Sequence, residues 1–382
     1  MSEPLFLLGA GASFEAGLPR GGELTKQVLE RMRALGHGAG AAATFHAVAC
    51  LLAKSAARNR AGFPNEDAKD FERVLETLSL LSRKHLQALA PLVAEWDADL
   101  RDAIDQQNDV PENPFDEARA TAALVALPRA LELKDTSRVA YLKPLLELRD
   151  GARRVIATVN YDNAIEIAAS DFSPKIPLET CIAPHGDHLD CWNRKRRIVP
   201  ADTGVTLLKL HGSITWKYKF TDQSHDWSDE ICEIREGRLT QEAEVELDAA
   251  VSGISATRRC RHVHRDAALI YDPVAKLGGP GPFVKLLGAF QDELWATDVL
   301  VIVGYSFRDE HINSVIVDWS GRGSKVVVVN GPAFTPDRIA CPSAVYLEKR
   351  LRTRFVNTGL RAAEGIARLA NEGWWPAADG GS

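Results

Sequence analysis

Several short polar segments of this chain contain residue types that handle phosphates, sugars and protons. One is Gly9-Ala10-Gly11-Ala12-Ser13, which directly follows the apolar run Leu5–Leu8. Glycine lets a backbone approach a pyrophosphate closely, and a helix start offers amides and a positive dipole. The pattern is not G-x-G-x-x-G, because Phe14 stands at the third glycine position, and it is not a P-loop. It predicts a phosphate-binding turn, with a plain strand-to-helix turn as the alternative.

A second segment, Thr158–Asp162, carries an amide and a carboxylate after the apolar run 154–159. Asn160 and Asp162 are suited to hydrogen-bond a ribose or to position a water. Asn and Asp are also common helix N-caps, and a helix is expected from about Ala164. The functional and the capping interpretations both stay open.

A third segment is His211-Gly212-Ser213, which ends the apolar run Val205–Leu210. Histidine at a strand end can serve as a general base near neutral pH. A purely structural histidine is the alternative.

Two further polar segments follow the last apolar runs. Gly304, Tyr305 and Ser306 come after the run 298–303, and Asn330 comes after Lys325–Val329. These residues are expected to contact the adenosine half of a dinucleotide, or to form ordinary turns.

The elements that must position these residues are buried strands alternating with helices. Continuous apolar runs are typical of parallel strands buried on both faces, and ligands bind at the carboxyl ends of such strands. The sequence therefore predicts an α/β fold with a Rossmann-type parallel sheet, helices on both faces and a helical insertion. We expect one domain, with a core of residues 1–22 and 151–345, an insertion at 23–150, and a C-terminal helix and tail at 346–382.

Composition narrows the class of protein. The 382 residues carry 46 Lys and Arg against 52 Asp and Glu, a net charge of −6, which does not favour an overall nucleic-acid or membrane binder. The basic runs 194–197 and 258–265 are expected to be solvated surface, with a partner or nucleic-acid contact as the alternative. Neither a secretory start nor a membrane span is evident, so we expect a cytoplasmic protein with reduced thiols.

Metal ligands occur together in one short stretch. Cys181, His185, His188 and Cys191 are each suitable for zinc, but their spacing fits no established pattern and the stretch reads as a loop. Glu310-His311 is not part of H-E-x-x-H. We therefore expect no metal.

The segments described above, taken in order, resemble the SIR2 (sirtuin) fold, and more closely the SIR2-like domains of bacterial anti-phage defence proteins. The resemblance extends from Gly9–Ser13 through Thr158–Asp162 and Leu210–Ser213 to the segment 303–313 and Asn330, nearly the whole chain. It implies NAD⁺ as the substrate, with phosphates at Gly9–Ser13. It further implies that Asn160 holds the ribose or the attacking water, that His211 acts as base or ribose contact, and that Asp162 orients the site.

Two departures separate the chain from protein deacylase sirtuins. Pro19 is followed by Arg20-Gly21-Gly22, where a deacylase has Pro-Asp-Phe-Arg, and no C-x-x-C pair exists for the zinc module. The resemblance therefore implies an NAD⁺ hydrolase that yields nicotinamide and ADP-ribose.

The family setting implies a latent effector that depletes NAD⁺ during infection. A homo-oligomer and a separate partner chain, such as a HerA-type ATPase, are expected from it. The alternatives are an NAD-dependent deacylase and a non-catalytic sensor of NAD or ADP-ribose. A dehydrogenase fits least, because no acidic residue clearly ends a second strand for the ribose.

Overall fold

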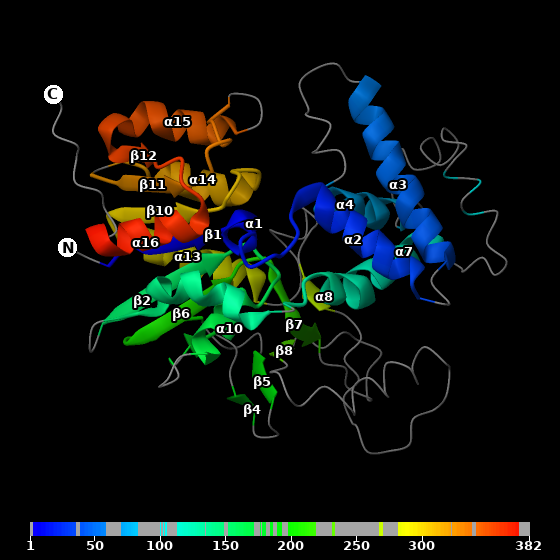
Figure 1. Ribbon diagram of the computed structural model, residues 1–382, viewed down its shortest axis with the longest axis horizontal. Helices are drawn as coiled ribbons and strands as arrows, with labels where there is room; N and C mark the ends of the chain where they lie inside the picture. Colours follow the sequence, from blue (N-terminus) through cyan, green and yellow to red (C-terminus); the bar gives the residue numbers. More distant parts are fainter. Residues whose placement is uncertain are drawn as a thin grey trace. The chain divides into compact units, whose positions relative to one another are not determined.

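The computed structural model covers the whole chain, and its elements are labelled in Figure 1. The residues that the structure describes are 3–35, 39–58, 70–82, 100, 102, 104, 113–133, 135–148, 152–171, 176, 178–180, 184–185, 189–192, 198–218, 231–233, 267–269, 282–321, 323–337 and 341–373.

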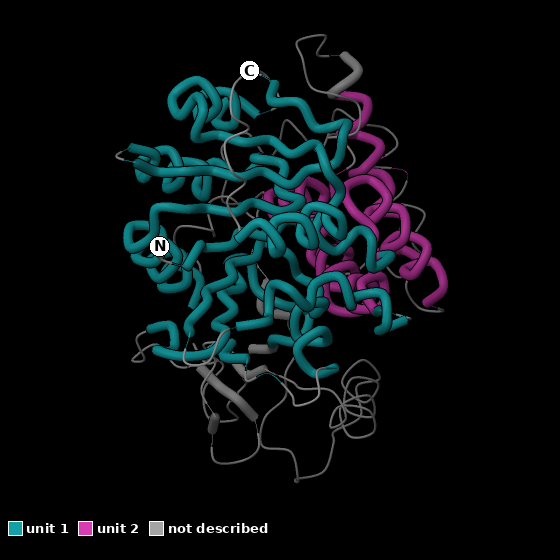
Figure 2. The backbone as a smooth tube through the Cα atoms, turned by 60° about the vertical axis from the view of Figure 1, so that its left-hand side comes forward, with its two compact units in different colours: residues 1–17, 133–270, 276–382 teal, residues 18–132, 271–275 magenta. Residues whose placement is uncertain are grey.

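The chain divides into two compact units, coloured separately in Figure 2. Unit 1 contains residues 1–17, 133–270 and 276–382, and unit 2 contains residues 18–132 and 271–275. The insertion expected at 23–150 overlaps unit 2, but residues 133–148 belong to unit 1 with the sheet. The single-domain organisation stays a prediction.

Unit 1 is built on a parallel sheet of seven strands in the order β12-β11-β10-β1-β2-β6-β3. The strands are β1 Leu5–Leu8, β2 Arg153–Thr158, β3 Leu178–Glu179, β6 Gly204–Lys209, β10 Val299–Val303, β11 Lys325–Val329 and β12 Phe355–Asn357. β1 and β10 are buried along their whole length, as their continuous apolar sequences predict. The predicted parallel α/β fold is confirmed.

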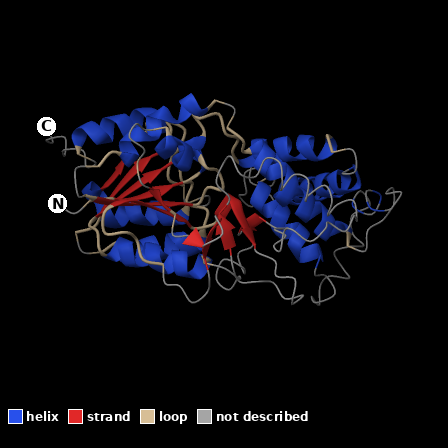
Figure 3. Ribbon diagram, turned by 90° about the horizontal axis from the view of Figure 1, so that it is seen from below, coloured by secondary structure: helices blue, strands red, loops and turns tan. Residues whose placement is uncertain are grey.

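Helices cover both faces of this sheet (Figure 3). The helices of unit 1 are α1 Ala10–Ser13, η4 Thr136–Leu142, α9 Lys143–Leu146, α10 Ala164–Ser170, α13 Phe283–Trp295, α14 Glu310–Trp319, α15 Pro342–Leu351, η5 Arg352–Arg354 and α16 Ala362–Glu372. One face packs its alternate residues, such as Leu7 and Ile302, against α13, α14 and α15. The other face is covered by α16, α9, η4 and α10, and Gly365 of α16 lies directly on Val329.

Unit 1 also contains a small antiparallel sheet of five strands. Its strands, in the order β4-β5-β8-β7-β9, are β4 Pro184–His185, β5 Leu189–Trp192, β8 Ile231–Glu233, β7 Gly212–Tyr218 and β9 Ala267–Leu269. The expectation that the stretch from Cys181 to Cys191 is a loop was wrong, because β4 and the start of β5 lie in it. Strands of two to four residues are too short to show an alternating pattern, and the second partner of β5 is the distant β8.

Unit 2 is helical in the part of it that the structure describes. Its helices are α2 Gly21–Arg33, α3 Ala39–Arg58, α4 Phe71–Ser82, α7 Pro114–Ala120, η3 Thr121–Ala126 and α8 Leu127–Ala130. The last three form one continuous helix with a π-helical stretch, in which the Leu127 amide donates to the Ala122 carbonyl five residues back. Pro128 follows at once and offers no backbone donor. None of the helices in the described part of the chain is long and apolar enough to cross a bilayer.

Candidate functional site

The predicted site residues of unit 1 follow neighbouring strands at one edge of the parallel sheet. Thr158 of β2 is paired with Lys209 of β6, so Asn160 and His211 each lie two residues beyond a paired position. Adjacent strands are about 4.8 Å apart. In the same way Gly304 and Asn330 each come directly after the paired residues that end β10 and β11.

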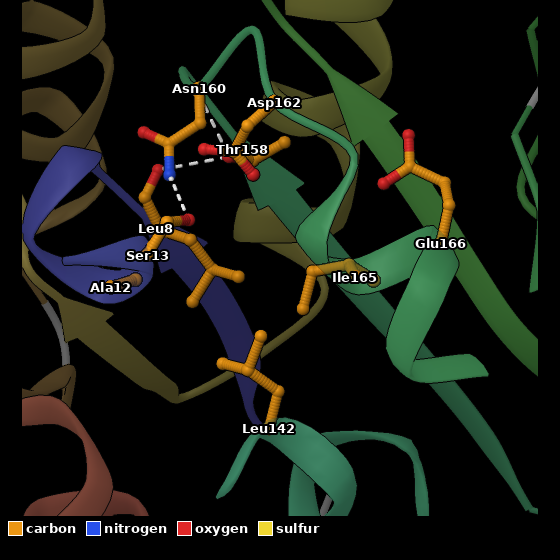
Figure 4. Close-up of a pocket in the computed structure, with 9 residues that line it drawn as sticks. All are labelled: Leu8, Ala12, Ser13, Leu142, Thr158, Asn160, Asp162, Ile165 and Glu166. Atoms are coloured by element: carbon orange, nitrogen blue, oxygen red, sulfur yellow. Dashed lines mark hydrogen bonds between the residues drawn. The ribbon is translucent and has the colours of Figure 1, made fainter. Parts of the chain in front are cut away.

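The Asn160 side chain reaches across to the turn after β1. Its Nδ2 donates to the Gly9 carbonyl at 2.9 Å and to Ser13 Oγ at 3.2 Å, and its own backbone amide donates to Thr158 Oγ1. Because the amide group faces this turn, the side-chain oxygen Oδ1 points the other way (Figure 4). An acceptor held in this manner suits a ribose hydroxyl or a water. Asn160 therefore does not act as a helix cap.

The glycines of the turn are needed for a close approach between two backbones. The Gly9 amide donates to the Val303 carbonyl and the Gly11 amide to the Gly304 carbonyl, both at 2.9 Å. A Cβ on Gly9 or Gly11 would lie 2.6–2.7 Å from backbone atoms of Gly304 or Tyr305. These two amides are thus used within the protein, which is the contribution expected of a tight turn. Their role toward a phosphate stays a prediction.

Asp162 lies at the start of α10, where its Oδ1 accepts the Ala164 amide at 3.0 Å. This bond spans two residues and forms an Asx turn just before the helix; the N-cap itself is Asn163, whose side chain makes no capping bond. Beneath this turn, fully buried Lys209 donates to the Asp162 carbonyl and to Glu166 Oε1, the latter at 2.7 Å. The turn that carries Asp162 is therefore held by a cation inside the sheet.

A small cavity lies between the end of β1 and the start of α10 (Figure 4). Its lining residues are Leu8, Ala12, Ser13, Leu142, Thr158, Asn160, Asp162, Ile165 and Glu166. Beside it, the Tyr141 hydroxyl donates to the Ala12 carbonyl. Burial, and next the negative charges of Asp162 and Glu15, raise the pKa of Tyr141 far above its usual value near 10. Tyr141 therefore stays a neutral donor here.

His211 is buried, with 1% of its side chain exposed. Its Nε2 lies 3.6 Å from Asp309 Oδ1, and its ring stacks on that of His311 at 5.5 Å between centroids. The ring of Tyr161, in the segment after β2, lies 6.4 Å from the His211 ring between centroids. This histidine is thus surrounded by ionisable and aromatic groups, an arrangement that suits proton transfer.

Most of the residues predicted to contact adenosine make hydrogen bonds or close contacts within the protein. The Tyr305 ring is buried in the core, and its hydroxyl donates to Asn313 Oδ1 at 3.0 Å. Asn330 Nδ2 donates to the Tyr305 carbonyl at 2.7 Å, whereas Ser306 is exposed. Gly304 has a φ of +66° and lies against Gly11 and Ala12. The contact with adenosine stays a prediction for all four.

Some residues of the site were missed by the sequence interpretation. Lys209 and Glu166 interact inside the fold, and the signal for them was a lysine in an otherwise apolar strand. Asp309 and His311 approach His211, and together the three offer ligand atoms within 4.8 Å of one another. The family resemblance included the segment 303–313 but implied no role for Asp309 or His311. The Cys181, His185, His188 and Cys191 side chains lie outside the described residues.

Comparison with known proteins finds no matching family model and no matching curated protein. Solved structures do match, among them a SIR2 homologue–NAD complex, at 15% identity over 97% of this chain and 89% of that chain, with a TM-score of 0.37. Another is SIR2 in complex with an inhibitor, 2'-O-acetyl-ADP-ribose and a deacetylated p53 peptide, at 12% identity over 97% and 94%, with a TM-score of 0.39. At these identities and TM-scores the likeness carries no conclusion about activity.

Proposed function

We propose that this protein hydrolyses NAD⁺ to nicotinamide and ADP-ribose, using Asn160 and His211 at the carboxyl edge of the parallel sheet. The observation that carries the proposal is that Asn160 and His211 occupy equivalent positions after two adjacent strands, β2 and β6. Each lies two residues beyond the paired Thr158 and Lys209, and the Asn160 amide is locked onto Gly9 and Ser13. The order of the sequence motifs supports the same substrate.

The proposed roles follow from the chemistry of each side chain. The bond between nicotinamide and ribose breaks with oxocarbenium-like character at the sugar, as in glycoside cleavage. Asn160 Oδ1 accepts a hydrogen bond from the ribose or from the attacking water. His211 takes the proton of that water, and the nearby Asp309 carboxylate stabilises the resulting imidazolium. The Asp162 turn that follows Asn160 is ordered by its bond from the Ala164 amide and by the Lys209 bond to the Asp162 carbonyl.

Regulation is a further part of the proposal. The motif resemblance to anti-phage defence domains supports a latent effector that lowers cellular NAD⁺ once triggered. A homo-oligomer and a HerA-type ATPase partner are proposed on that same basis.

The test is nicotinamide release from NAD⁺ by the purified chain, alone, with an acetyl-lysine peptide, and with lysate of phage-infected cells. We expect release without peptide, lowered at least 100-fold, or about 2.7 kcal/mol, by Asn160→Ala or His211→Ala. Asn357→Ala in unit 1 and His46→Gln in unit 2, both at exposed positions, serve as matched controls that keep activity.

Other outcomes would change the function. Release only with the peptide would identify a deacylase, and binding of NAD⁺ without release under all three conditions would identify a sensor. Near wild-type release by a folded Asn160→Ala/His211→Ala double variant would overturn the site.

A further inference from the structure

His211, Asp309 and His311 bring two imidazoles and a carboxylate together. Their ligand atoms all lie within 4.8 Å of one another, although His211 follows β6 and the other two lie at the start of α14. Two imidazoles with one carboxylate are a common ligand set for zinc and for other first-row transition metals.

The spacing within this group suits a shared cation. The 3.6 Å between His211 Nε2 and Asp309 Oδ1 exceeds the usual length of a hydrogen bond, about 2.7–3.2 Å. Two ligands bound at about 2.1 Å in tetrahedral geometry lie about 3.4 Å apart. The pair is therefore already close to the separation that one bound ion would impose.

Burial favours the same conclusion. The exposed fractions of the His211 and Asp309 side chains are 1% and 13%, and His311 is half-buried. A carboxylate facing an imidazole in a low-dielectric site provides charge for a cation that water does not screen well.

The segment that carries Asp309 and His311 is fixed by buried hydrogen bonds. Phe307 has a φ of +58°, and its carbonyl accepts a bond from Asn313 Nδ2 at 2.8 Å. Asn313 Oδ1 in turn accepts the Tyr305 hydroxyl. The ring of His311 is further held by its stacking on His211. Ligands whose supporting groups are held in this way need little reorganisation on binding.

We propose that His211, Asp309 and His311 bind a divalent transition-metal ion of the zinc class, with the fourth position left for water. This departs from the expectation, drawn from the sequence, that the protein holds no metal. Its consequence for catalysis rests on the proposed function: a metal ion on His211 occupies the lone pair that would accept a proton. Metal-bound and catalytically active forms would then exclude each other.

The test measures binding of Zn²⁺ by equilibrium dialysis and of Co²⁺ by its visible absorption, on chelator-treated full-length protein. The parent chain carries Cys181→Ser and Cys191→Ser, which removes competing ligands from that stretch. His311→Gln and Asp309→Asn are compared with His46→Gln, a histidine whose Nε2 lies 3.6 Å from Cys50 Sγ in unit 2. Circular dichroism checks folding, and if His311→Gln does not fold then Asp309→Asn decides.

We expect the parent and His46→Gln to bind one more equivalent of metal than the other two variants. Affinity in those two should fall by more than about tenfold, the lower limit for loss of even an outer-shell partner. Equal stoichiometry and affinity in all four proteins would overturn the metal site. The dialysis result does not depend on NAD⁺ cleavage, so failure of the proposed hydrolase activity is recognised separately.

Discussion

Two groups of polar residues at the sheet edge of unit 1 hold their side chains differently. In the Asn160 group, Asn160 donates to Gly9 and Ser13, and Lys209 of β6 donates to Glu166 and to the Asp162 carbonyl. In the His211 group, which follows the non-adjacent strands β6 and β10, His211 stacks on His311 and faces the Asp309 carboxylate beyond usual hydrogen-bond length.

The Asn160 group of residues holds its side chains in fixed positions, whereas the His211 group can bind and release a proton or a cation. Hydrogen bonds at normal length orient a side chain and contribute to stability. Ionisable groups that face one another at a longer distance gain most when a proton or a cation joins them. Substitutions in the Asn160 group are therefore expected to change mainly stability, and substitutions in the His211 group mainly binding and catalysis.

The close contact between the turns that follow β1 and β10 gives the largest expected effect on stability. A Cβ on Gly304 would lie 2.0 Å from the Ala12 amide nitrogen, and φ there is +66°. Gly304→Ala should lower the free energy of unfolding by about 4 kcal/mol or more. Gly323→Ala, at φ +74° with open space around it, should cost only about 1 kcal/mol. Equal losses in urea unfolding would show that the close approach contributes nothing.

The buried pair beneath Asp162 tests the Asn160 group directly. Glu166→Ala removes the carboxylate that pairs with fully buried Lys209 and should lower the free energy of unfolding by about 3 kcal/mol. Lys209→Met should lower it by about 1 kcal/mol, because Glu166 is 20% exposed, and the double variant should resemble Lys209→Met. In the His211 group, Asp309→Asn should change it by less than about 0.5 kcal/mol, because the Asp309 side chain makes no capping bond to α14 and Asn suits the N-cap position equally well. Chemical denaturation of all four variants measures this, and a larger loss for Asp309→Asn than for Glu166→Ala would reverse the comparison.

A further prediction concerns the dependence of stability on pH at Tyr141. Because its pKa is raised in the folded protein, the unfolded chain ionises first, near pH 10, and stability is lost as the pH rises above that value. Tyr141→Phe should cost about 1 kcal/mol at pH 8 through the lost bond to Ala12, and this difference should shrink by about pH 10.5. Urea unfolding at the two pH values tests it. A constant difference would mean that the folded environment does not resist ionisation.

Much of the parallel sheet could be predicted from the sequence, because a buried parallel strand needs a continuous apolar run. The expected Leu5–Leu8 and Lys325–Val329 coincide with β1 and β11, and the C-terminal helix expected within 346–382 corresponds to α16. The edge strands β3 and β12 were missed, since strands of two or three residues carry too little pattern to recognise.

The site itself could be predicted only in part. Asn160 and Asp162 have similar residue types and both follow β2, yet one reaches across to Gly9 and the other forms a local turn before α10. Only the path of the chain after Thr158 distinguishes them. The approach of Asp309 to His211 depends on the left-handed backbone at Phe307 and on Asn313, which are contacts distant in sequence from β6.

The abrupt change from one sheet to the other at His211 has a mechanical consequence. β6 ends at Lys209 and β7 begins at Gly212, so only Leu210 and His211 separate the parallel sheet from the antiparallel one. Gly212, at φ +90°, provides the sharp change of direction. A tilt of the small antiparallel sheet would therefore move the His211 imidazole directly, because no loop lies between the two sheets to absorb the motion.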